Sequence, residues 1–169
     1  MRAVFDPAAF AFVPQLEAAC GEVLAELRSL PNDAFAVSPD SLTAVADGYD
    51  ESGWQWYGLV GADPALAAHR ARCPRTTQAC ERVPGLRNAG FSRLLPGTRL
   101  WPHCGELPGV LRCHLALEVP AGDVGLRVAG SVHRWQPGRC LVFDDTFEHD
   151  AWNLAAAPRT VLLITFARP

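Results

Sequence analysis

Features that mark several protein classes are missing from this sequence of 169 residues. It has no lysine, and all 15 of its basic residues are arginine. The net charge of -3 and the lack of any run of like charges predict no nucleic-acid partner. It has neither a stretch of ~18 apolar residues nor a charged start followed by a long apolar core, so we expect no membrane partner and no secretion signal. These absences favour a cytoplasmic location.

The spacing of the six cysteines excludes two common motifs. No two cysteines form a Cys-x2-Cys pair, which argues against a zinc ribbon and against a thioredoxin motif. In a reducing compartment we expect free thiols, with Cys113 and Cys140 buried in apolar strands. Cys73 and Cys80 would pair only under oxidising conditions, and we do not expect that bond.

The sequence does contain enough apolar residues for one domain. With 49% hydrophobic residues it can bury a core of its own. Apolar residues recur every three to four positions over residues 14–29, which predicts an amphipathic helix. We expect a single domain over residues 1–169, with a helical and irregular N-terminal layer at 1–89 and the catalytic barrel core at 90–169.

From Gly90 onward the pattern changes to short strands between turn residues. Pro96-Gly97 separates two of these strands and predicts a β-hairpin. Together the strands and the preceding helices predict a mainly β fold with flanking helices, a double-stranded β-helix barrel of the jelly-roll or cupin type with an N-terminal helical layer. The expected strands cover residues 91–95, 98–101, 111–119, 125–129, 139–143 and 159–166.

One expected strand carries a pair of cationic side chains on a single face. Side chains alternate along a strand, so Arg112 and His114 share the face opposite the apolar odd-numbered residues. The small Ala116 leaves space beside them, which a buried carboxylate would fill. A solvent-facing polar surface is the alternative, and this strand alone does not decide between the two.

Histidines and arginines gather in the same part of the chain. Arg159 opens an apolar strand, where a guanidinium needs either a partner or exposure at the strand end. His103, His114, His133 and His149 all lie in the strand-rich part. Two imidazoles with open coordination positions suit non-haem iron(II), commonly with a carboxylate as third ligand.

Several motifs in order make a family resemblance specific. The segments that carry it are Ser92-Arg-Leu-Leu-Pro-Gly-Thr-Arg-Leu-Trp-Pro-His-Cys-Gly105, Leu111-Arg-Cys-His-Leu-Ala-Leu117, Trp135-Gln-Pro-Gly-Arg-Cys-Leu-Val-Phe-Asp-Asp-Thr-Phe-Glu-His-Asp-Ala-Trp-Asn153, and Arg159. They resemble the catalytic domain of the aspartyl/asparaginyl β-hydroxylases, which are iron(II)- and 2-oxoglutarate-dependent dioxygenases with a double-stranded β-helix fold. The resemblance covers residues 90–168, and more loosely the region from Trp54.

The resemblance implies a two-histidine iron site. His103 and His149 match the positions of the iron ligands. Gly105 stands where most oxygenases of this superfamily have a carboxylate ligand, so a water, chloride or the neighbouring Glu106 would fill that coordination position. Asp144, Asp145 and Glu148 are interpreted as groups that orient His149.

The resemblance also implies the cosubstrate site. Ser92 and Arg159 match the positions that bind the distal carboxylate of 2-oxoglutarate, and Arg112 and His114 those that bind the carboxylate next to the iron. The cofactors implied are Fe(II), 2-oxoglutarate and O2, with ascorbate in support. The expected reaction is hydroxylation of an unactivated carbon, such as the β-carbon of an Asp-like or Asn-like unit.

Two alternatives and the substrate stay open. A 2-oxoglutarate-dependent halogenase would place chloride at the vacant ligand position. A non-enzymatic cupin-like binding domain would use the histidines only structurally. A small molecule, amino acid or peptide is the expected substrate, and Trp54, Trp56 and Tyr57 are candidates either for a pocket wall or for the core.

Overall fold

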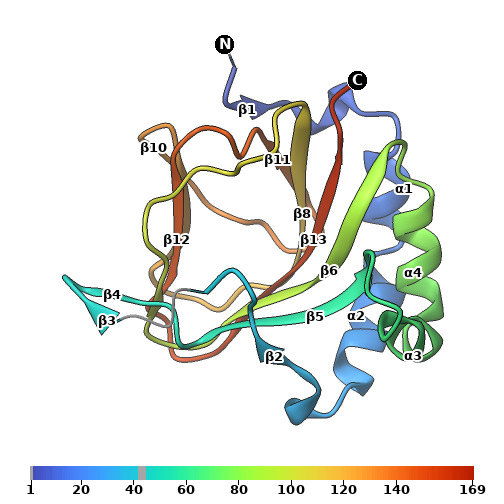
Figure 1. Ribbon diagram of the computed structural model, residues 1–169, viewed down its shortest axis with the longest axis horizontal. Coiled ribbons are helices and arrows are strands. Elements are labelled where there is room, and N and C mark those ends of the chain that lie inside the picture. Colours follow the sequence, from blue (N-terminus) through green and yellow to red (C-terminus); the bar gives the residue numbers. More distant parts are fainter. Residues whose placement is uncertain (1, 42–44) are drawn as a thin grey trace.

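The computed structural model describes residues 2–41 and 45–169, which form two facing antiparallel sheets with helices outside one of them (Figure 1). In the described residues the larger sheet contains, in spatial order, β1 (Val4–Phe5), β11 (Cys140–Phe143), β8 (Val110–Glu118), β13 (Arg159–Ala167), β6 (Leu86–Leu94), β5 (Trp54–Val60) and β2 (Ala36–Val37). The smaller contains β10 (Ser131–His133), β9 (Val124–Val128), β12 (His149–Asn153), β7 (Thr98–Arg99), β4 (Tyr49–Asp50) and β3 (Val45–Ala46). This arrangement confirms the predicted fold class.

The helices lie against the outer face of the larger sheet, on the right of Figure 1. They are α1 (Val13–Ala18), α2 (Cys20–Ser29), α3 (Leu66–Arg72) and α4 (Pro74–Glu81), with short 3-10 helices η1 (Pro7–Ala9) and η2 (Asn32–Ala34). The helix predicted over residues 14–29 is therefore two helices. They meet at Ala19, whose ψ of -5° departs from the α-helical value of about -42°.

The larger sheet separates two hydrophobic cores. On β8, Leu111, Cys113 and Leu115 pack toward the helices, whereas Ala116 belongs to the core between the sheets. Arg112 and His114 line a cavity on that same inner side. The predicted alternation along this strand is confirmed, and its polar face points into the barrel rather than to solvent.

The hairpin predicted at Pro96-Gly97 is wrong. β6 pairs with β5 and β13 in the larger sheet, whereas β7 pairs with β12 and β4 in the smaller one. Gly97 adopts a φ of +86°, and its N–H donates to the carbonyl oxygen of Asn153 on β12. The turn thus moves the chain from one sheet to the other, because its backbone bonds to a strand distant in sequence instead of closing a local ladder.

Free thiols are found at all six cysteine positions, including Cys73 and Cys80. Burial raises the pKa of Cys73 to about 11 and that of Cys80 to about 12, so both are protonated at neutral pH. Cys113 and Cys140 are buried as predicted. Among the described helices, none is both long and apolar enough to cross a bilayer.

Candidate active site

A cavity of about 450 Å³ lies between the two sheets, a size typical of small-molecule sites. Both sheets contribute side chains to its wall. The six residues predicted from the sequence all line it: Ser92, His103, Arg112, His114, His149 and Arg159. The fold therefore brings together residues that are up to 67 positions apart in the chain.

His103 and His149 face each other across a short backbone bridge. The N–H of His103 donates to the carbonyl oxygen of His149 at 3.0 Å, and the N–H of His149 donates back at 2.9 Å. Their ring centroids are 4.3 Å apart. His149 begins β12, and His103 lies in the segment that continues β7 beside it. Two imidazoles are thus presented side by side from adjacent extended segments.

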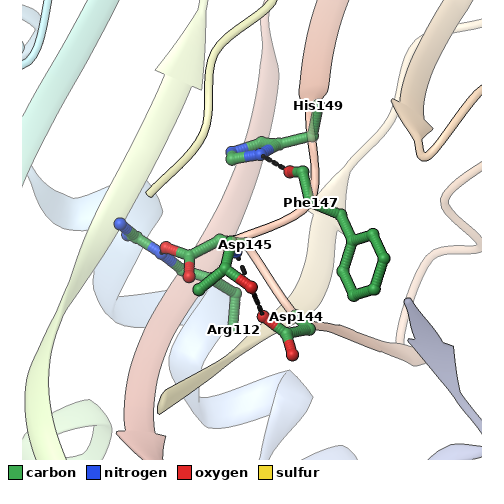
Figure 2. Close-up of polar contacts among 6 residues, drawn as sticks. Arg112, Asp144, Asp145, Phe147 and His149 are labelled. Carbon is green, nitrogen blue, oxygen red and sulfur yellow. Dashed lines mark hydrogen bonds and ion pairs between the residues drawn. The ribbon is translucent and has the colours of Figure 1, made fainter. Parts of the chain in front are cut away.

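Each of these rings uses its Nδ1 in the same way. Nδ1 of His103 lies 2.7 Å from the carbonyl oxygen of Trp101. Nδ1 of His149 lies 2.9 Å from the carbonyl oxygen of Phe147, a contact that Figure 2 shows. A carbonyl only accepts, so each Nδ1 carries the proton and each Nε2 keeps its lone pair. This backbone contact is the usual way in which a metal-binding histidine is oriented. The pair fits a metal ion.

The charge state of His149 also suits a metal ligand. Burial, followed by the nearby His103, lowers the pKa of His149 to about 4. The imidazole is therefore neutral at physiological pH. A neutral ring binds a metal ion without first releasing a proton.

No third histidine, cysteine, aspartate or glutamate completes a metal-sized cluster with them within the described residues. Glu106 is exposed and lines the cavity. A Cβ built on Gly105 would lie 2.5 Å from the carboxyl carbon of Asp145. The space beside Gly105 is thus occupied by a carboxylate that comes from another part of the chain.

Asp145 is held by an ion pair rather than by His149. Its Oδ2 accepts from Nε of Arg112 at 2.7 Å, and the two side chains lie beside each other in Figure 2. Its Oδ1 is buried and has no hydrogen-bond partner in the described part of the chain. Asp144 instead bonds to Thr146 and Arg168. The carbonyl of Phe147, and not these carboxylates, therefore contacts Nδ1 of His149.

A buried cation lies at another wall of the cavity. The side chain of Arg159 is 2% exposed, and its Nη1 donates to the carbonyl oxygen of Ser92 at 3.2 Å. Its guanidinium carbon lies 4.5 Å from the ring centroid of Trp135. Its Nε has no partner among the described residues, and burial lowers its pKa to about 9. A buried guanidinium of this kind is stabilised by a bound anion.

His114 offers a second unpaired donor. Its Nδ1 accepts a hydrogen bond from Nε1 of Trp135 at 3.3 Å, which places the ring proton on Nε2. That Nε2 is buried and lacks a partner within the described chain. Burial, then the charges of Arg159 and Arg112, hold the pKa of His114 well below its usual value. A neutral ring that donates from Nε2 suits a carboxylate oxygen.

The sequence pattern missed some residues of this site. Of the aromatic candidates, Trp54 lines the cavity, where its Nε1 donates to Oγ of Ser92 at 3.2 Å. Tyr57 instead packs in the helix-side core. Trp135 bonds to His114, and Asp145 bonds to Arg112. No local pattern in the sequence predicted these two contacts, although Trp135 and Asp145 lie within the motifs that carry the family resemblance.

Comparison with known sequences decides the family. The model of the aspartyl/asparaginyl beta-hydroxylase family matches residues 17–169. The chain belongs to this family.

Two curated relatives show how far the β-hydroxylase likeness extends. An ornithine lipid ester-linked acyl 2-hydroxylase from Rhizobium tropici is 35% identical over 98% of this chain, and a human aspartyl/asparaginyl beta-hydroxylase is 35% identical over 57% of it. The chain spans 60% of the Rhizobium protein and 13% of the human one. The match is therefore to a part of each of these longer proteins.

Solved structures agree with the β-hydroxylase fold. A Pseudomonas putida prolyl 4-hydroxylase has a TM-score of 0.54 and 18% identity, covering 90% of this chain and 88% of its own. A Trichoplax adhaerens prolyl hydroxylase, in complex with a hypoxia-inducible factor peptide, has a TM-score of 0.57 and 14% identity, covering 89% and 78%. At such identities the likeness establishes the shared double-stranded β-helix fold.

The close approach of Gly105 to Asp145 leads to a stability prediction. Gly105→Ala is expected to lower the free energy of unfolding by ~1–3 kcal/mol, because the added methyl group displaces a buried carboxylate from Arg112. Urea denaturation measures the change. Gly21→Ala is the control: Gly21 lies in the first turn of α2 with nothing within 4 Å of an added Cβ, so the substitution is expected to be neutral or stabilising. Equal effects of the two substitutions would contradict the prediction.

Proposed function

We propose that this chain is an iron(II)- and 2-oxoglutarate-dependent dioxygenase that hydroxylates an unactivated carbon. One observation carries the proposal: a single cavity presents two histidines with free Nε2 atoms and, on its wall, a buried guanidinium whose Nε lacks a partner in the described chain. The first feature suits a metal, and the second suits an anionic cosubstrate. Membership of a hydroxylase family supports the same activity.

Six residues that line the cavity have roles in this proposal. His103 and His149 hold the iron through Nε2. Arg159 and Ser92 bind the distal carboxylate of 2-oxoglutarate, because a guanidinium in a dry pocket binds a carboxylate more strongly than an exposed one does. Nε2 of His114 donates to the carboxylate next to the iron, with Arg112 beside it.

When bound, iron with 2-oxoglutarate and O2 supplies the oxidising power to hydroxylate a C–H bond, and 2-oxoglutarate leaves as succinate and carbon dioxide. The protein positions the reactants and keeps water out. Trp135 packs against Arg159 and bonds to His114, so it fixes both cosubstrate contacts at once. Asp145 holds Arg112 at the cavity wall.

The names of the relatives point to a substrate class. The β-carbon of an aspartyl or asparaginyl unit is bonded to a carboxyl or amide carbonyl carbon, and position 2 of an ester-linked acyl group is bonded to an ester carbonyl carbon. We propose that this chain also hydroxylates a carbon next to a carboxyl-derived carbonyl, in an amino acid, a peptide or a small molecule. The six free thiols support a reducing compartment such as the cytoplasm.

Asp145 argues against the halogenase alternative. Its carboxylate lies next to Gly105, where the third ligand position would be, and its Oδ1 has no partner among the described residues. A water molecule there would donate a hydrogen bond to Oδ1, whereas a chloride ion has no hydrogen to donate and would give this buried oxygen none. Water is therefore the proposed occupant of that position.

Succinate formation tests the proposal. The protein with iron(II), 2-oxoglutarate, ascorbate and air is expected to form succinate, and chloride is expected to change neither rate nor product. A chlorinated product in the presence of chloride would support the halogenase. If no succinate forms and 2-oxoglutarate does not raise the melting temperature, the non-enzymatic binding domain is supported instead.

A further inference from the structure

Three polar residues lie next to one another on adjacent strands of the cavity wall. Thr165 on β13 pairs in register with Asn88 on β6 and with Arg112 on β8. All three line the cavity. They thus form a transverse row across the inner face of the larger sheet.

This row is distant from the proposed site for the distal carboxylate. Arg159 and Thr165 are six residues apart on β13, which corresponds to roughly 20 Å along an extended strand. The register pair of Leu163 with His114 lies between them. The row instead ends at Arg112, whose Nε donates to the carboxylate of Asp145 beside Gly105. A molecule that contacts this row lies on the far side of His114 from Arg159.

The hydroxyl group of Thr165 lacks a hydrogen-bond partner among the described residues. The side chain of Thr165 is 3% exposed. Buried hydroxyl groups in folded proteins are usually hydrogen-bonded, so an orphan that borders a cavity indicates a ligand. Asn88, its cross-strand neighbour in register, also lines the cavity, and its carboxamide has two further N–H donors. Two neighbouring donors suit an oxygen acceptor.

We propose that Thr165 and Asn88 bind the substrate through its carbonyl group, the one next to the carbon that is hydroxylated. The inference rests on the proposed function, which assigns Arg159, Ser92, His114 and Arg112 to the cosubstrate and leaves Thr165 and Asn88 for the substrate. The shared chemistry is a carboxyl-derived carbonyl, whether it comes from an amino-acid side chain or from an acyl ester.

Calorimetric titration of zinc-loaded protein tests the inference, because zinc occupies the metal site without redox turnover. 2-Oxoglutarate is titrated first, and four probes are then titrated into the saturated protein. Three probes carry the carbonyl: N-acetyl-aspartate amide, N-acetyl-asparagine amide and ethyl butyrate. The fourth, N-acetyl-2-aminobutyrate amide, has a methyl group in its place.

Thr165→Val removes the hydroxyl group with little change of shape. We expect it to raise the Kd of the carbonyl probes that bind by about tenfold, the effect of losing one hydrogen bond. The Kd of the 2-aminobutyrate probe and that of 2-oxoglutarate are expected to stay at their wild-type values. Thr160→Val is the matched control: Thr160 lies on the same strand with a buried hydroxyl group that has no partner among the described residues, but it does not line the cavity.

The outcomes separate the two proposals. Binding of an amino-acid probe or of the ester supports the inference and identifies the source of the carbonyl. An unchanged Kd in Thr165→Val overturns it, as does failure of all three carbonyl probes to bind the saturated wild type at millimolar concentration. Failure of 2-oxoglutarate itself to bind would overturn the proposed function in the first titration. Asn88→Ala, at an exposed position, repeats the test if Thr165→Val does not fold.

Discussion

Arg159→Met is expected to abolish tight binding of 2-oxoglutarate and, at the same time, to stabilise the ligand-free protein. The affinity should fall at least ~30-fold, because truncating one partner of a buried charge pair costs ~2–5 kcal/mol. The free energy of unfolding without ligand should rise by ~1–4 kcal/mol, the range seen when buried charged groups are replaced by apolar ones. The physical reason is that burial already lowers the pKa of Arg159 to about 9.

Thermal denaturation with and without 2-oxoglutarate measures both effects in one experiment. The wild type should gain stability with ligand concentration, because the ligand binds only the folded state, whereas Arg159→Met should not. Arg93→Met is the control, since Arg93 is partly buried but packs over Phe35 outside the cavity. It should retain the ligand-dependent gain. An Arg159→Met protein that is stabilised by 2-oxoglutarate as the wild type is would remove the proposed role of this arginine.

His103→Ala and His149→Ala are each expected to lower metal affinity and succinate formation more than a hundredfold. Loss of an outer partner of a metal ligand costs ~10–100-fold, and loss of a ligand itself should exceed that. No other protein ligand can replace a lost histidine, since no third His, Cys, Asp or Glu joins the pair in the described chain. Bound iron per protein molecule and the rate of succinate formation are the two measurements.

The control for both variants is His133→Ala. His133 lies on β10 and does not line the cavity, so its replacement should leave metal content and turnover unchanged. Full 2-oxoglutarate turnover by His103→Ala would contradict the assignment of the iron site. Loss of metal in His133→Ala as well would show that the assay reports folding rather than coordination.

Local patterns in the sequence predicted the fold class and one polar strand face that lines the cavity, whereas the assignment of the other site residues came from the family resemblance. The alternation on β8 correctly separated Arg112 and His114 from the apolar residues that pack on the helices. The same alternation, counted along β13 from Arg159, could also have indicated Thr165, which lines the cavity but was not among the predicted site residues. Such inferences work because side-chain direction in a strand depends only on position along that strand.

Contacts between distant segments could not be read in this way. The turn at Pro96-Gly97 has the composition of a hairpin, yet it joins two sheets because Gly97 bonds to Asn153 on another strand. Likewise, the ion pair of Arg112 with Asp145 bridges residues 33 positions apart. Neither partner carries a local signal for the other.

By itself, the sequence determined a β barrel with a helical layer, free thiols, and motifs with histidines and arginines at positions that match those of one enzyme family. The tertiary structure alone decided that His103 and His149 meet across a bridge, that a carboxylate lies beside Gly105, and that Asn88 and Thr165 are neighbours. The reason is physical: periodicity along a strand is a local property, whereas strand register and sheet closure depend on the packing of the whole chain.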